Sequence, residues 1–287
     1  MSLHIATNAY LVLLSISTLV LISIGLAVIF GLMGVINLAH GEFIMLGAYT
    51  CVFTVNMGAP LLVGFLAAML AVGLFGILVE RLVIRFLYGR LIDTLLATWG
   101  LSLFIAGAVT TIFGPKSYGI NVNFGNVTVG AASFGSYNLL LSVVAIVTLV
   151  ATWGLLRFTR FGLIVRGTMQ NATMASAMGV NKTLVHTATF GIGSALAGLA
   201  GAALVPLTGV SPTLGVSFVT KAFITVIAGG HLPILGTIAA SSLFGLIDGT
   251  LSHLSTSVVG EVGVLIVAVA LLRLLPTGIT GRMKRGI

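Results

Sequence analysis

The sequence contains very few charged residues. Asp, Glu, Lys and Arg together make up 6% of its 287 residues, far below the roughly 25% of an ordinary soluble domain. Five residues are acidic, and the single cysteine, Cys51, has no partner for a disulfide within the chain. These shortages exclude one large or two small soluble domains, and they exclude a disulfide-stabilised scaffold.

Long apolar runs take the place of charge. Hydrophobic residues make up 58% of the chain, the mean hydropathy is +1.22, and 37 glycines suit helices that pack closely in lipid. A helix needs about 20 apolar residues to cross a bilayer. Runs of that kind lie near 9–36, 41–58, 61–84, 94–113, 138–157, 183–207, 218–254 and 258–275. The prediction is an all-α, polytopic transmembrane helix bundle of about eight membrane segments, some of them broken or re-entrant.

The basic residues predict which side of the membrane each loop faces. Most of the thirteen lie in three regions, 81–90, 157–182 and 282–285, and the positive-inside rule puts all three in the cytoplasm. Counting the spans then puts the N-terminus outside and the C-terminus in the cytoplasm. The region 218–254 is too long for one straight helix, so it either crosses twice or re-enters. The loop 114–137 lies outside and is predicted to form a short β-hairpin.

Residues 157–182 form the longest polar segment of the chain. Apolar runs of membrane-spanning length flank it on both sides, and it contains four of the thirteen basic residues. A polar loop of this length between two spans is best explained as a surface offered to another protein. We therefore predict that a soluble partner binds the chain here.

Three polar residues, Asn37, His40 and Glu42, lie between the first two spans with almost no loop around them. Polar groups at membrane depth are costly unless they line a cavity or pair, so they are candidates for a substrate pathway. Transporters use such broken helices to aim helix ends at a substrate. The alternative is a tight turn at the cytoplasmic surface, with Glu42 in the first turn of the next helix. Asn37, the deepest of the three, favours the pathway.

A second break lies at 228–237, where Gly229, Gly230 and Pro233 make a straight helix unfavourable. It is either a membrane-embedded turn that shapes a pore or an ordinary loop between two short spans. Asp248 and Glu261 flank the last turn on the outside and are predicted to be solvated. No charged binding residue is evident in the middle of a span.

The sequence has no constellation typical of an enzyme. It contains no HExxH, GxSxG or CxxC motif and no phosphate-binding GxxxxGK[ST] loop. Small residues at four-residue spacing in 193–203 indicate close helix packing and no chemistry. If the protein works against a gradient, the nucleotide chemistry has to be on another chain.

Two stretches resemble a known family. Residues 31–50, GLMGVINLAHGEFIMLGAYT, are similar to the signature of the inner-membrane permeases of bacterial ABC importers for branched-chain amino acids, urea and short amides. Residues 166–181, RGTMQNATMASAMGVN, are similar to the loop on which that family docks its ATPase. Further similarity at 93–103, at 170–175 and at 229–237 favours the urea branch. One departure is Leu232, where relatives usually carry glycine.

The resemblance implies a single permease domain over 1–287, with an ATPase-docking loop at about 158–182, in a bacterial inner membrane. The implied partners are a homologous second permease, two cytoplasmic ATP-binding subunits and an extracytoplasmic solute-binding protein. No cofactor is expected on this chain, because ATP and Mg belong to the partner subunits. Besides Asn37, His40 and Glu42, the implied pathway includes Gly229 and Gly230. The implied coupling residues are Arg160, Arg166, Gln170, Asn171, Met174, Ala175, Met178 and Gly179.

The mechanism that follows is alternating access driven by ATP, with urea or a short amide as the favoured substrate and a branched-chain amino acid next. A short helix from the loop would insert the side that carries Met169, Met174 and Met178 into an ATPase groove. The alternative is a passive channel for small neutral solutes, which needs no motor. A third class, an intramembrane enzyme, requires paired acids or a metal cluster, and the sequence contains neither.

Overall fold

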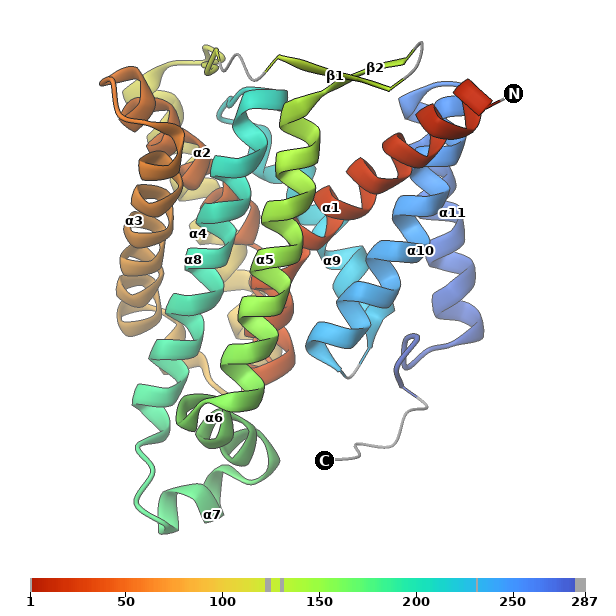
Figure 1. Cartoon of the computed structure of the whole chain (residues 1–287). Helices are drawn as coiled ribbons and strands as arrows, with labels where there is room; N and C mark the ends of the chain where they lie inside the picture. Colours follow the sequence, from red (N-terminus) through yellow and green to blue (C-terminus); the bar gives the residue numbers. More distant parts are fainter. Residues whose placement is uncertain (1, 122–124, 130–131, 231, 282–287) are drawn as a thin grey trace.

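A computed structural model describes residues 2–121, 125–129, 132–230 and 232–281 of the chain. They form a helical bundle with one small hairpin (Figure 1). The elements, in chain order, are α1 Ser2–Met33, α2 His40–Asn56, α3 Leu61–Leu82, the 3-10 helix η1 Ile84–Leu87, α4 Leu91–Phe113, β1 Asn126–Val129, β2 Ala132–Gly135, α5 Ser136–Phe158, α6 Arg160–Gln170, α7 Ala172–Ala177, α8 Lys182–Thr208, α9 Leu214–Gly229, α10 Pro233–Leu254 and α11 Ser257–Leu274. The all-α prediction is confirmed.

Seven helices in the described part of the chain are long and apolar enough to cross a membrane: α1, α3, α4, α5, α8, α10 and α11. Two more, α2 and α9, are shorter. At 1.5 Å per residue, the 16 residues of α9 extend about 24 Å, less than the about 30 Å of hydrocarbon. The predicted region 218–254 is therefore two antiparallel helices, α9 and α10, which meet at the lower end of Figure 1.

The loop 114–137 contains the hairpin that its alternating pattern predicts. β1 and β2 pair antiparallel, with Asn126 opposite Gly135 and Val129 opposite Ala132. Tyr118 forms an isolated antiparallel bridge with Val210, so the loop is tied to the end of α8. The hairpin and the start of α1 lie at one end of the bundle, and α6 and α7 project from the other (Figure 1).

Helix α8 lies at the centre of the bundle, where it packs on α1, α2 and α3. Its small residues allow these contacts: Gly193 lies against Gly25 and Ile29 of α1, and Gly201 lies against Ile44 and Ala48 of α2. In the most apolar window of α8, 72% of the residues are buried, against 11% for α11. The predicted packing role of 193–203 is confirmed.

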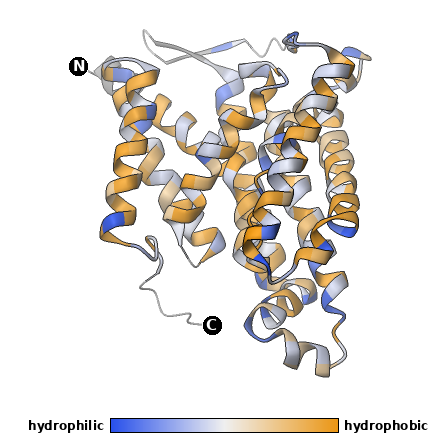
Figure 2. Cartoon of the chain, turned by 180° about the vertical axis from the view of Figure 1, so that it is seen from behind, coloured by the Kyte–Doolittle hydropathy of each residue, from blue (hydrophilic) through white to orange (hydrophobic). Residues whose placement is uncertain are grey.

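The outer helices present apolar side chains to their surroundings. On α3, exposed leucines recur at four-residue spacing, which places them along one face. They are Leu62, Leu66, Leu70, Leu74, Leu78 and Leu82. Hydrophobic residues colour most of the length of the helices, while hydrophilic ones gather toward the two ends and on α6 and α7 (Figure 2). This is the pattern of a protein whose solvent is lipid around its middle.

Candidate functional site

Hydrogen bonds hold the non-helical segment between α1 and α2 against α4. Gly34 has a φ of +65°, a value that favours glycine, and it ends α1. The amide of Gly34 still donates to the carbonyl oxygen of Phe30 at 2.9 Å, and residues 35–39 are then not helical until α2 begins at His40. The hydroxyl of Thr98 on α4 accepts from the amide of Leu38 at 3.1 Å and lies 3.2 Å from the carbonyl oxygen of Ile36. The side chain of Thr98 therefore forms hydrogen bonds with non-helical backbone groups, which lipid could not form.

All three polar residues predicted at this break are buried, and each keeps one atom without a partner. Asn37 and His40 are fully buried and Glu42 is 1% exposed. Nδ2 of Asn37, Nδ1 of His40 and Oε2 of Glu42 have no hydrogen-bond partner within the described part of the chain. Each such group costs about 1–3 kcal/mol. Unsatisfied buried polar groups call for an explanation, such as a water molecule or a ligand.

The three side chains face different neighbours. Asn37 folds back on its own turn, where Oδ1 accepts from the amide of Ala39 at 3.1 Å. Nε2 of His40 lies 3.0 Å from the carbonyl oxygen of Ile22 on α1. His40 and Glu42, two residues apart in sequence, therefore do not form one constellation.

Glu42 is enclosed between α4 and α9. The hydroxyl of Ser102 on α4 donates to Oε1 of Glu42 at 3.1 Å. On the other side lies Gly215 of α9, where an added Cβ would stand 2.6 Å from the carboxyl carbon of Glu42. Glu42 is in the first turn of α2, as the alternative interpretation expects, yet it lies inside the bundle.

The second break is closed by the segment that follows α11. Gly229 packs backbone to backbone on Gly236, and Gly230 has a φ of +87°. The amide and hydroxyl of Thr280 both donate to the carbonyl oxygen of Gly229, at 3.1 Å and 2.6 Å. The amide of Leu232 donates to the same hydroxyl at 3.2 Å. Leu232 has a φ of −97°, which any residue adopts, so the missing family glycine leaves this turn unstrained.

The two predicted breaks lie against each other. A Cβ on Gly31, near the end of α1, would overlap the ring of Pro233 at the start of α10. His231 and the basic tail 282–285 lie outside the described residues.

The predicted docking segment forms two short helices that project from the bundle. Three side chains cap these two helices and the start of α8: Oγ1 of Thr159 accepts from the amide of Gly162 at 3.1 Å, Oδ1 of Asn171 from that of Met174 at 2.9 Å, and Oδ1 of Asn181 from that of Leu184 at 3.2 Å. Helix α6 buries Val165 and Thr168 toward the bundle, whereas α7 buries no residue. The caps make the shape of this segment a local property of its sequence.

Most of the predicted coupling residues are exposed on this segment. Met174 is 61% exposed and Met178 81% exposed. Arg160, Gln170, Asn171 and Gly179 are exposed as well, and Arg166 and Ala175 are partly buried. Nε of Arg166 donates to the carbonyl oxygen of Gly162 at 3.3 Å, within its own helix. Met169 differs from the other two methionines, because it packs against the inner cluster that contains Val165 and Leu156. The three methionines therefore do not share one exposed face.

Sequence reasoning missed a buried carboxylate at the base of this segment. Glu80 of α3 is fully buried. It accepts from the hydroxyl of Tyr88 at 2.5 Å and from that of Thr187 on α8 at 2.6 Å. Burial, together with the hydrogen bond to Glu80, raises the pKa of Tyr88, so this phenol stays a donor. The loop after α3 is thus fastened to the first turns of α8, directly after the docking segment.

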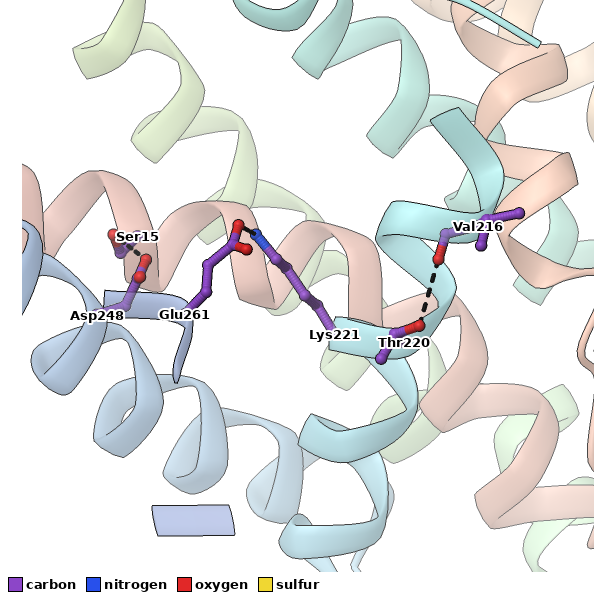
Figure 3. Close-up of polar contacts among 6 residues, drawn as sticks. All are labelled: Ser15, Val216, Thr220, Lys221, Asp248 and Glu261. Atoms are coloured by element: carbon purple, nitrogen blue, oxygen red, sulfur yellow. Dashed lines mark hydrogen bonds and ion pairs between the residues drawn. The ribbon is translucent and has the colours of Figure 1, made fainter. Parts of the chain in front are cut away.

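Lys221 was also missed. It lies in the middle of α9, and its Nζ forms an ion pair with Oε1 of Glu261 on α11 at 2.5 Å. Asp248 accepts from the hydroxyl of Ser15 at 2.9 Å (Figure 3). The prediction that the two acids are simply solvated is incomplete, because each has a protein partner on another helix. An apolar helix of the bundle, α9, does carry a charged residue away from its ends.

Comparison with known proteins relates nearly the whole chain to one family. Residues 8–275 match the family described as the permease component of branched-chain amino acid transport systems. The high-affinity branched-chain amino acid transport system permease protein LivH of Salmonella typhimurium is 33% identical over 288 residues, which cover 93% of this chain and 92% of that protein. BraD of Pseudomonas aeruginosa is 33% identical over 290 residues with the same shares. A probable LivH of Methanocaldococcus jannaschii is 26% identical over 278 residues, 92% of this chain and 88% of that protein.

Proposed function

The chain belongs to the family of permease components of branched-chain amino acid transport systems, and from that premise we propose that it forms half of the translocation pathway of an ATP-driven importer. It is a multi-pass membrane protein and a transport component, not an enzyme. A second, homologous permease supplies the other half of the pathway. Two ATP-binding subunits supply the force, and a solute-binding protein delivers the substrate. ATP and Mg bind those subunits, and this chain needs no cofactor.

The observation that carries the proposal is the projecting pair α6 and α7. Met174 and Met178 lie on and directly after the short helix α7 and are 61% and 81% exposed, and apolar side chains that gather on a projecting surface are typical of a protein-binding site. Met174 and Met178 supply adaptable apolar surface of the kind that binding interfaces use. Only residues 178–181 separate α7 from α8, the most central helix of the bundle. A motor that pulls on α7 therefore acts on the helix that contacts α1, α2 and α3.

Charge supports the orientation. The end of α3, the start of α4 and helix α6 lie at the end of the bundle opposite the start of α1 (Figure 1). These segments carry the basic residues Arg81, Arg85 and Arg90 around η1, and Arg157, Arg160 and Arg166 near α6. The positive-inside rule assigns that end to the cytoplasm. The N-terminus then lies outside and the C-terminus inside a bacterial inner membrane.

The substrate path in this proposal runs beside the α1–α2 break, between the two permeases. Polar atoms without a hydrogen-bond partner lie there on Asn37, His40 and Glu42. These atoms can gain hydrogen-bond partners when the bundle rocks between outward-facing and inward-facing states. Gly229 and Gly230 let α9 and α10 turn against the end of α1. ATP binding shifts the population between the two states only through its different affinity for them.

We propose a branched-chain amino acid as the substrate. This changes the order of the sequence-based expectation, which favoured urea or a short amide. The relatives described above are transport permeases for branched-chain amino acids, and their similarity extends over nearly the whole chain. Urea and short amides remain the second candidates.

Reconstitution tests the proposal. The chain, its second permease and its ATPase subunits are placed in liposomes with the binding protein on the outside, and uptake of labelled L-leucine and labelled urea is followed with and without internal ATP. The proposal expects leucine uptake that requires ATP and that stops when Met174 and Met178 are both replaced by Glu. Uptake that proceeds equally without ATP would support the passive channel instead.

A further inference from the structure

A cavity of about 290 Å³ lies between α1, α9, α10 and α11. Its walls are of two kinds. Lys221, Glu261 and Asp248 contribute charges of both signs, and Leu19, Ile224 and Val264 contribute apolar surface. Ligand pockets combine a mostly apolar lining with a few placed polar groups, and they begin at roughly 300 Å³. The cavity is at the small end of that range, which suits a compact solute.

The three charged groups come from three different helices, α9, α10 and α11, and all three line this cavity. Figure 3 shows the contacts that they form. Each already has a partner: Lys221 pairs with Glu261 at 2.5 Å, and Asp248 accepts from Ser15 at 2.9 Å. Charged side chains within spans are expensive, and they generally face a cavity or mark a substrate path. A purely structural ion pair would not need a third charge and an open space beside it.

We propose that this cavity binds the head group of an α-amino acid zwitterion. The carboxylate of the ligand takes Lys221 in exchange for Glu261, and its ammonium group takes Asp248. The branched side chain lies against Leu19 and Ile224. This proposal rests on the proposed function, since it names the place where the amino acid pauses on its way through the permease.

The exchange at Lys221 is inexpensive. The side chains of Lys221 and Glu261 are 41% and 54% exposed, so the protein does not enclose the pair and a ligand in the cavity can reach Lys221. A carboxylate from the ligand replaces the ion pair that Glu261 gives up, so Lys221 keeps one carboxylate partner. Glu261 thus holds Lys221 in place while the cavity is empty and competes with the ligand for it.

Thiol protection tests binding without requiring transport. Ser217 lines the cavity and is exposed, so Ser217→Cys in the reconstituted transporter is expected to react with a hydrophilic methanethiosulfonate. Cys51 is buried and stays in place. L-leucine should slow the reaction, whereas leucinamide and 4-methylpentanoate, which each lack one of the two charges, should need about tenfold higher concentrations. Ser255→Cys, on the exposed turn after α10, is the control that leucine should not protect.

Two substitutions at the ion pair separate a binding site from a structural contact. Lys221→Gln and Glu261→Gln break the same pair, so a structural role makes their effects alike. A binding role makes them differ: Lys221→Gln should raise the leucine concentration for half-protection about tenfold or more, and Glu261→Gln should leave it unchanged or lower it. Asp248→Asn should weaken protection as Lys221→Gln does.

The failures of the two proposals look different. If the wild type takes up leucine with ATP but leucine does not protect Ser217→Cys, or the analogues protect equally, or Lys221→Gln and Glu261→Gln behave alike, the binding site is wrong and the importer stands. If leucine protects the thiol as described but no ATP-driven uptake occurs, the site stands and the proposed function is wrong.

Discussion

Replacing Gly201 with Ala should loosen the central helix pair of the bundle. A Cβ at this position would overlap the carbonyl oxygen of Ile44 and stand 2.8 Å from the amide nitrogen of Ala48, both on α2. Because these atoms belong to the backbone, no side chain can rotate away, and the two helices must separate. Overpacking of this kind costs about 1–3 kcal/mol.

A second effect acts in the opposite direction. Alanine is favoured over glycine inside a helix by up to about 1 kcal/mol. At Gly201 the clash should win, with a net loss of about 2 kcal/mol in the free energy of unfolding when the overpacking cost is near the top of its range. Gly107 of α4 is the matched control, because a Cβ there meets nothing within 4 Å. Gly107→Ala should therefore gain stability, by at most about 1 kcal/mol.

Thermal unfolding of the purified protein in detergent measures the difference. A loss of 2 kcal/mol corresponds to a fall in Tm of about 4–8 °C for a chain of this size. In the reconstituted transporter, Gly201→Ala should also lower ATP-driven uptake, because α8 connects the docking segment to α2. If Gly201→Ala melts at or above the temperature of the wild type, as Gly107→Ala should, the close contact between α2 and α8 is not the packing constraint described here.

Three further predictions concern single side chains. Tyr88→Phe removes the hydrogen bond to Glu80 and should lower the free energy of unfolding by about 1–2 kcal/mol; an unchanged thermal melt would show that this bond does not fasten the loop after α3. Glu42→Gln keeps an acceptor for Ser102 and removes a half-satisfied carboxyl, so the Tm should hold or rise while leucine uptake falls; a lower Tm would contradict the geometry around Glu42. Met178→Glu should leave the Tm unchanged, since this side chain is 81% exposed, but it should abolish co-purification of the ATPase subunits. Retained co-purification would show that α7 is not part of the docking surface.

Helix positions follow from the sequence because they depend on local composition. The predicted span 94–113 corresponds to α4, Leu91–Phe113, and the predicted span 183–207 corresponds to α8, Lys182–Thr208. The caps at Thr159, Asn171 and Asn181 are equally local, since each accepts from an amide three residues ahead. Where a structural feature depends on one stretch of the chain alone, the hydropathy and the capping residues of that stretch suffice to predict it.

Contacts between helices do not follow in this way. Lys221 meets Glu261 across 40 residues of sequence, and Ser15 meets Asp248 across 233. Such pairs depend on how each helix is rotated about its axis, and packing of the whole bundle sets that rotation. Hydropathy identifies α9 as apolar without showing that Lys221 points into a cavity.

For the same reason, the sequence does not determine whether a methionine faces the bundle or the surroundings. Met169 and Met174 lie in the same polar stretch, but α6 packs on the bundle while α7 projects beyond it. Met169 is therefore partly buried against the inner cluster, and Met174 is exposed. Sequence spacing alone cannot distinguish the two, because the chain bends between α6 and α7.

The central claim is that a cytoplasmic ATPase drives this bundle through α7, and cross-linking tests it most directly. Met178→Cys in the assembled transporter is expected to cross-link to an ATPase subunit, with a yield that changes when ATP is added, and to be shielded from thiol reagents applied from outside the cell. A cysteine at this position that forms no cross-link to the ATPase, or that reacts with an impermeant reagent added outside, would contradict the account.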